Sequence, residues 1–284
     1  MKLGIITSPD EQGFQYVKKF GLDTAEYCIN VGTDAKAIDA AQLQALSAQY
    51  GVQVASIGRW GSGRILPDGG FNTPEQEQDL ALIDLCEALG TPVFVCGCNP
   101  IEGMPFEENA QHAAAYFQSL IDYAAPKNIA VAVYNCDWNN MIYDKRGWDI
   151  VLPLVPGLGI KYDTSHCINR EGDYLKEMMD YGQHIKHFHV KGTVRVCGNN
   201  IPDPPAGLDL TNWGAVMAML YTHKYKAALS IEPHSTIWQH GPIGDWGVRF
   251  TIEMISKYIM PEDAEGDGAI LGGPTREEIN SKLG

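Results

Sequence analysis

The sequence Ile129-Ala130-Val131-Ala132-Val133 is a short, continuous run of apolar residues. Such a run is typical of a strand in a parallel sheet that is covered on both faces. Similar runs recur along the whole chain, and each is followed by a segment with apolar residues at helical spacings of three and four. The eight predicted strands are Lys2–Thr7, Thr24–Val31, Val52–Arg59, Pro92–Cys98, Ile129–Cys136, Leu158–Asp163, Ile185–Lys191 and Ala227–Pro233.

Eight strand-then-helix units predict an α/β protein with a single (β/α)8 TIM barrel, spanning residues 1–260. A doubly wound open sheet is disfavoured, because no Gly-rich fingerprint follows the first strand. From Pro261 onward the composition becomes polar, acidic and Gly-rich, so residues 261–284 are expected to form a separate tail. The tail is either loosely ordered or packed on a neighbouring subunit, which leaves a homo-oligomer open.

The chain carries 35 acidic and 21 basic side chains, a formal net charge of −14. This charge disfavours nucleic acid and anionic membrane surfaces as partners. No apolar run approaches the roughly 18 residues that a membrane span needs. No signal peptide is visible, so a cytoplasmic protein is expected, although a removed leader would leave the same sequence. The seven cysteines include no CxxC pair and are expected to be free thiols.

Polar residues end the last strands, on the side of the barrel where this fold builds its active sites. Each has an ordinary alternative: Asp163 as a helix N-cap, Glu232 in a surface ion pair, and His189 as a packed barrel residue. Taken together, these three side chains should meet at one point above the barrel. Without a cation their carboxylates would repel each other. They are therefore predicted to bind one divalent metal ion, with Mn²⁺ favoured over Mg²⁺, Co²⁺ or Zn²⁺.

Three motifs in combination resemble the xylose-isomerase-like TIM barrels, the sugar (phosphate) isomerases and epimerases related to the AP endonucleases of family 2. The motifs are Asp163-x-x-His166, His187-x-His189-Val190-Lys191 followed by Arg195, and Ser230-Ile231-Glu232. The resemblance covers most of residues 1–260. It implies that Asp163, His189 and Glu232 are metal ligands, that His166 and Arg195 bind substrate, and that Glu232 is also a catalytic acid/base. His187 lies one layer deeper on the same strand face and is expected to support the site.

The fifth strand departs from the family, which usually has a glutamate there that ligates metal and exchanges a proton with the substrate. Gap-free alignment places Tyr134 or Asn135 at that position. Either Asn135 supplies an amide oxygen as the fourth ligand, or water fills the place. The pair of opposed carboxylates that a two-base epimerase needs is therefore in doubt.

The expected reaction is removal of the proton next to the carbonyl of a keto-sugar, with stabilisation of the enolate. With a single base, the enolate can expel a leaving group, so β-elimination from a 3-keto-glycoside is favoured. Glu232 or His166 would be the base, and Lys191 or Arg195 would stabilise the oxyanion. The alternative is an isomerase or epimerase that acts on a free ketose.

Other functions are weaker candidates. The negative charge argues against an abasic-site nuclease, and a non-catalytic sugar-binding barrel would require that the missing glutamate reflects loss of activity. No phosphate-binding loop is evident, so a small unphosphorylated carbohydrate is the expected substrate. Trp60, Tyr134 and Trp138 are predicted to lie in strand-end loops, where they either stack on the sugar or simply pack against the protein.

Overall fold

The computed structural model describes residues 1–261 and shows a closed barrel of eight parallel strands in the order β1-β10-β7-β6-β5-β4-β3-β2. The predicted (β/α)8 barrel is therefore confirmed. The barrel closes between the first and last strands, where Leu3 pairs with Leu229. Its strands are β1 (Leu3–Thr7), β2 (Thr24–Asn30), β3 (Gln53–Trp60), β4 (Val93–Cys96), β5 (Ala130–Tyr134), β6 (Gly159–Asp163), β7 (Ile185–Val190) and β10 (Leu229–Ile231).

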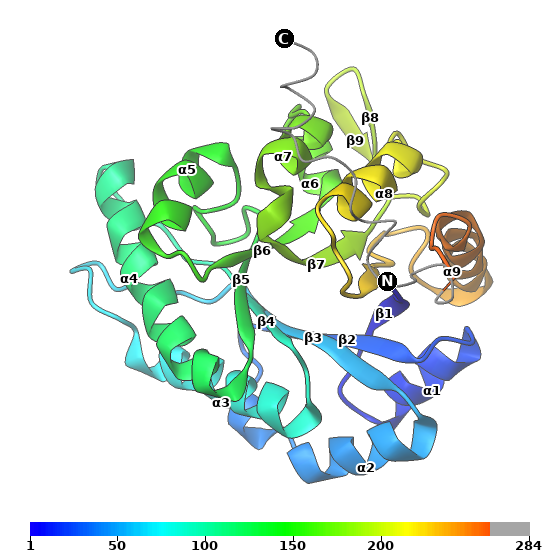
Figure 1. Ribbon diagram of the computed structural model, residues 1–284, viewed down its shortest axis with the longest axis horizontal. Helices are drawn as coiled ribbons and strands as arrows, with labels where there is room; N and C mark the ends of the chain where they lie inside the picture. Colours follow the sequence, from blue (N-terminus) through cyan, green and yellow to red (C-terminus); the bar gives the residue numbers. More distant parts are fainter. Residues whose placement is uncertain (262–284) are drawn as a thin grey trace.

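Helices surround the strands (Figure 1). Two of them end at Gly51 and Gly90, which adopt the left-handed conformation of a C-terminal cap. The α-helices are α1 (Glu11–Lys19), α2 (Ala40–Tyr50), α3 (Thr73–Leu89), α4 (Phe106–Ala124), α5 (Lys145–Leu154), α6 (Thr164–Asn169), α7 (Tyr174–Tyr181), α8 (Trp213–Thr222) and α9 (Gly241–Ser256). Within residues 1–261, none of these helices combines the length and apolar character needed to span a bilayer.

A small antiparallel hairpin interrupts the regular alternation after β7. It consists of β8 (Val194–Val196) and β9 (Asn199–Ile201), and it projects from the end of the barrel (Figure 1). The predicted tail, residues 261–284, lies outside the described part of the chain except for its first residue.

The strands have two different faces because successive side chains point to opposite sides of a sheet. One set, which includes Phe94, Val131 and Phe188, packs with the helices in the large apolar core. The alternate positions face the inside of the barrel. On one side of this interior, Trp60, Val95 and their neighbours form a small apolar cluster, made of Trp60, Val93, Val95, Ala132 and Tyr134. The opposite side carries charged residues, and these form the site.

Candidate active site

The catalytic end of the barrel contains a cavity of about 440 Å³, which we call the main cavity. This volume lies within the range of roughly 300–1,000 Å³ that is typical of small-molecule sites. Its polar lining comes from β2, from β6 and β7 with the segments that follow them, and from the segment after β10. The lining residues used below are Cys28, Trp60, Cys136, Trp138, Lys161, His166, His189, Lys191 and Glu232.

Asp163 ends β6, and its side chain is fully buried. Its Oδ1 atom accepts a hydrogen bond from the backbone N–H of Ser165 at 2.8 Å. Asp163 is therefore the N-cap of helix α6, which is the ordinary role that the sequence offered for it. Its Oδ2 atom has no hydrogen-bond partner among residues 1–261. The nearest cationic groups to Oδ2 are Lys191 Nζ at 3.3 Å and Lys161 Nζ at 4.0 Å. One oxygen of Asp163 thus holds the local backbone, and the other lies in the site with Lys191 as its nearest cation.

Asn135 follows β5 and is bound to the backbone of Asp163 on both sides of its amide. The side-chain nitrogen donates to the Asp163 carbonyl at 2.8 Å, and the side-chain oxygen accepts the Asp163 N–H at 3.0 Å. The buried amide therefore fixes the position of Asp163. This contact gives Asn135 a positioning role next to the predicted ligand set.

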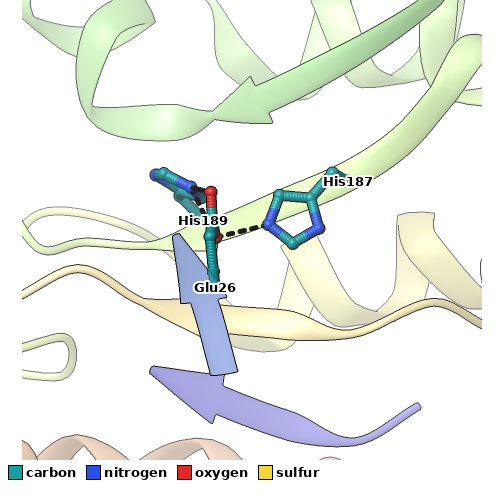
Figure 2. Close-up of side chains that lie close together, drawn as sticks. All are labelled: Glu26, His187 and His189. Atoms are coloured by element: carbon teal, nitrogen blue, oxygen red, sulfur yellow. Dashed lines mark hydrogen bonds and ion pairs between the residues drawn. The ribbon is translucent and has the colours of Figure 1, made fainter. Parts of the chain in front are cut away.

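A buried network of one carboxylate and two imidazoles adjoins the main cavity through His189. Figure 2 shows its three side chains. Glu26, in the middle of β2, lies between His187 and His189 of β7. The distances from Glu26 oxygens to the Nε2 atoms are 2.6 Å for His187 and 2.9 Å for His189. On the other side of its ring, His189 Nδ1 lies 2.8 Å from Glu232 Oε2. His189 therefore connects the buried glutamate to the carboxylate at the cavity.

The protonation of this network follows from its burial and charges. Burial by itself raises the pKa of Glu26, but the two histidines outweigh this effect and hold that pKa below its usual range. Burial lowers the pKa of His187, so its Nε2 carries the single ring proton toward Glu26. His189 also loses basicity through burial, yet Glu26 and Glu232 raise its pKa overall. Because an ionised carboxylate only accepts hydrogen bonds, both ring nitrogens of His189 carry a proton here, Nε2 toward Glu26 and Nδ1 toward Glu232 at the cavity.

Glu232 lies directly after β10, and Lys191 lies directly after β7. Burial by itself raises the pKa of Glu232, but Lys191 and His189 hold it well below its usual range. Lys191 Nζ lies 3.5 Å from Glu232 Oε2 and 3.3 Å from Asp163 Oδ2, and these two carboxylates raise the pKa of the lysine despite its burial. At neutral pH the site therefore contains two carboxylates with a bound ammonium group between them.

One group of side chains fits a divalent cation. Asp163, His189 and Glu232 offer ligand atoms that all lie within 4.8 Å of one another. The unpartnered Oδ2 of Asp163 and the ring atom Nδ1 of His189 belong to this group. The chemistry of the set, two carboxylates and one imidazole, is typical of divalent metal sites. The contact between His189 and Glu26 matches the carboxylate–histidine–metal arrangement that orients a metal ligand.

A second group, Glu26 with His187 and His189, has the same spacing but a different character. Its members are completely buried and already satisfy one another with hydrogen bonds. This group supports the first one and is the weaker candidate for a metal.

His166 lies on α6, with its Nε2 atom 3.5 Å from Asp163 Oδ2. Burial and the nearby Lys191 ammonium lower the pKa of His166 to about 3, so the ring is neutral at pH 7. It lines the main cavity together with His189, Lys191 and Glu232, as expected from the sequence. A neutral imidazole at this place can accept a proton.

The three predicted sugar-stacking aromatics differ in position. Trp60 is the last residue of β3 and lines the main cavity, while Trp138 lies in the loop after β5 and also lines it, with 47% of its surface exposed. Tyr134 ends β5 and is fully buried, stacked against Trp60 with ring centroids 5.5 Å apart. It is therefore placed behind Trp60, and its hydroxyl donates to the Trp138 carbonyl at 2.9 Å. Tyr134 is absent from the lining residues of the main cavity.

Arg195 lies on β8 of the hairpin, outside the main cavity. Its guanidinium donates to Glu171 at 2.7 Å and to Asn200 of β9 at 2.8 Å. The structure therefore does not bring Arg195 together with Asp163, His189 and Glu232. It places this side chain where it can position Asn200.

Two charged residues of the site were missed by sequence reasoning. Glu26 and Lys161 lie inside buried strands, each on the face that points into the barrel. Lys161 lines the main cavity, and Glu26 holds both histidines of β7. A charged residue inside a buried strand is uncommon and normally has a partner, so this was the signal available in the sequence.

The fold and these strand-end residues define the class of protein. The family model of the xylose isomerase-like TIM barrel matches residues 14–254, and the chain belongs to this family. Among solved structures, the chain is similar to D-allulose 3-epimerase from Methylomonas sp. in complex with D-allulose, with 19% identity, coverage of 91% of this chain and 97% of that one, and a TM-score of 0.73. The chain is also similar to 3-keto-D-glucoside 4-epimerase from E. coli, with 16% identity, coverage of 90% of this chain and 99% of that one, and a TM-score of 0.67.

A third similar structure is the IOLI protein with a bound zinc atom, at 14% identity, coverage of 92% and 100%, and a TM-score of 0.72. At these identities the structures support the fold. No curated protein matches the chain.

Proposed function

We propose that this protein is a divalent-metal-dependent enzyme that removes the proton next to the carbonyl of a keto-sugar, and that it catalyses β-elimination from a 3-keto-glycoside. The observation that carries this proposal is the composition of the main cavity. Among the described residues that line it, Glu232 is the one carboxylate, and it faces two lysines and a neutral histidine. This arrangement provides one anionic base together with cationic groups for a developing enolate.

Asp163, His189 and Glu232 would hold the metal ion. When bound there, a divalent cation would act as a Lewis acid for the ketone oxygen and the neighbouring hydroxyl group. The similar structure with a bound zinc atom supports a metal in this family. Glu26 would keep His189 in the tautomer that leaves Nδ1 free, and Asn135 would hold Asp163 in place.

In the proposed reaction, a Glu232 oxygen takes the proton from C2 of the 3-keto-sugar. The C–H electron pair forms the C1–C2 double bond, and the C1–O bond to the leaving group breaks with its electrons remaining on oxygen. This oxygen receives the proton back from Glu232, so the products are an unsaturated keto-sugar and a free alcohol. The ammonium of Lys191, with Lys161 nearby, stabilises the negative charge on the ketone oxygen while the proton is held.

The fifth strand favours elimination over a two-base reaction. Its end supplies an asparagine that is bound to the backbone and a cysteine that lines the main cavity. The described lining therefore contains no second carboxylate that could return a proton to the opposite face of the sugar after Glu232 has removed one. The enolate can instead react by expelling the leaving group, which needs no second base.

One observation favours the alternative, an isomerase or epimerase of a free ketose. His166 lines the same cavity with a neutral ring and can serve as a second base. The two similar sugar epimerases, one acting on D-allulose and one on a 3-keto-D-glucoside, support a reaction of this class.

The test is incubation of metal-loaded protein with a panel of 3-keto-glycosides and free ketoses in D₂O, with aglycone release and deuterium uptake followed together. We expect aglycone release that is lost in Glu232→Gln and kept in Glu253→Gln, a matched change at an exposed position of α9. Deuterium in recovered or isomerised sugar, with no aglycone released, would reject elimination and support the alternative.

A further inference from the structure

A second, smaller cavity of about 310 Å³ lies beside the main cavity and is bordered by the loop after β5, by α6 and by the β8–β9 hairpin. We call it the polar cavity, because all of its lining residues carry hydrogen-bonding side chains. His166 lines both cavities and therefore marks the place where they meet. The other lining residues are Asn135, Asp137, Tyr143, Asn169, Arg170 and Asn200.

Several of these groups have unused hydrogen-bonding capacity. The Asp137 carboxylate and the Tyr143 hydroxyl have no side-chain hydrogen bond within residues 1–261. The oxygen of Asn169 accepts from Thr193 at 2.9 Å, which leaves its amide nitrogen available. The side-chain oxygen of Asn200 accepts a hydrogen bond from Arg195 at 2.8 Å, which leaves the amide nitrogen of Asn200 available. The cavity thus offers an acceptor, a hydroxyl and two amide donors.

The charges that line the polar cavity disfavour the binding of an anionic ligand. Among the described residues that line it, the one guanidinium is that of Arg170, which donates two hydrogen bonds to Glu177 at 2.7 and 2.8 Å. Asp137 adds a negative charge that no described cation neutralises. A phosphate or carboxylate group would therefore meet repulsion, whereas a neutral polyol can both donate to and accept from these side chains.

The hairpin positions one wall of this cavity. Arg195 holds Asn200 on one side and Glu171 on the other, with the Glu171 contact at 2.7 Å. The side chain that the family resemblance assigned to substrate thus acts through Asn200, and we regard it as a positioning residue.

We propose that the polar cavity binds a second, neutral sugar unit, so that the substrate is a keto-disaccharide whose leaving group is itself a sugar. This inference rests on the proposed function, because it places the keto-sugar in the main cavity and its leaving group next door. His166 then lies beside the glycosidic oxygen. Hydrogen bonds to the leaving sugar provide binding energy remote from the reacting carbon atoms.

The test uses unreactive sugars, so that binding is measured apart from the reaction. Glucose, maltose, cellobiose, trehalose and sucrose are titrated into the full-length protein by calorimetry, with inorganic phosphate as the anionic probe. We expect at least one disaccharide to bind at least about tenfold more tightly than glucose, because the second sugar unit adds several hydrogen bonds. Phosphate is expected to leave this binding unchanged.

Two variants locate the effect. Asn200→Ala and Asn169→Ala are expected to remove most of the gain for the disaccharide and to leave glucose affinity unchanged. Asn199→Ala, on the same hairpin but outside the cavity lining, is the matched control. The inference is overturned if no disaccharide binds more tightly than glucose, if the variants weaken glucose equally, or if phosphate competes. Disaccharide binding of this pattern without aglycone release from any 3-keto-glycoside would reject the proposed function and keep the second subsite.

Discussion

The buried carboxylate of Glu26 allows a sharp test of how the site is built. Glu26→Gln keeps the shape of the side chain and removes its negative charge. The glutamine oxygen can still accept from His189 Nε2, and its amide can donate to His187, which only has to move its ring proton to the unpartnered Nδ1 atom. The barrel should therefore fold, with a loss of about 1–3 kcal/mol in the free energy of unfolding.

The larger effect is expected on metal affinity. Glu26 contacts His189 at 2.9 Å and orients the ring nitrogen that faces Asp163 and Glu232. Changes to such supporting contacts typically cost about 10–100-fold in metal affinity. This factor corresponds to about 1.4–2.7 kcal/mol of binding free energy.

The assay is calorimetric titration of Mn²⁺ into metal-free wild-type protein, Glu26→Gln and a matched control. The control is Glu75→Gln, which removes a carboxylate that pairs with Arg59 at 3.1 Å and lies outside both candidate metal groups. We expect the Mn²⁺ affinity to fall only in Glu26→Gln. An unchanged affinity in Glu26→Gln, or an equal loss in the control, would refute the role given to Glu26.

Three further predictions concern stability and substrate binding. Asp79→Ala leaves the fully buried Arg64 without its ion-pair partner, now 2.7 Å away, and should cost about 3–5 kcal/mol in chemical denaturation; a loss below 1 kcal/mol would show that the pair is dispensable. Gly13→Ala brings a new Cβ atom to 2.0 Å from the Ser8 carbonyl oxygen, so the free energy of unfolding should drop by about 1–3 kcal/mol, and an unchanged free energy of unfolding would contradict this close approach. Trp138→Ala removes an exposed ring from the main cavity and should raise the KM for the sugar substrate about two- to tenfold with little change in kcat; an unaltered KM would remove this residue from the binding surface.

The barrel could be predicted because its signal is local and repeated. A run such as Val131–Val133 identifies a buried strand by itself, and eight such runs with helical segments between them leave few alternatives. Asp163, His189 and Glu232 could also be brought together from sequence, since parallel strands end on the same side of the barrel.

The rest depended on which strands face each other across the barrel. Glu26 comes from β2 and meets β7 only because the sheet closes between β1 and β10. Glu26 lies inside its strand, whereas the predicted site residues were sought at the ends of the strands. Tyr134 was expected either to stack on the sugar or to pack against the protein, and at the end of β5 its ring packs against Trp60.

Arg195 shows a different limit of sequence reasoning. The spacing of the motif placed it near the substrate, but the short β8–β9 pairing carries it away from the main cavity and against Glu171 and Asn200. Its contacts depend on a hairpin of two three-residue strands, whose residues are half-buried or exposed and give no strong apolar pattern.

Asp163, His189 and Glu232 are proposed to hold one divalent cation at the C-terminal end of the barrel strands. Equilibrium dialysis of the metal-free protein against Mn²⁺ tests this proposal most directly, with Asp163→Asn and the exposed change Glu253→Gln measured alongside. We expect one Mn²⁺ per chain for wild type and Glu253→Gln. Binding in Asp163→Asn should be at least about 100-fold weaker, because loss of a direct ligand should cost at least as much as the roughly 10–100-fold typical of a lost supporting contact. Equally tight Mn²⁺ binding in Asp163→Asn, or no stoichiometric binding by the wild type, would contradict it.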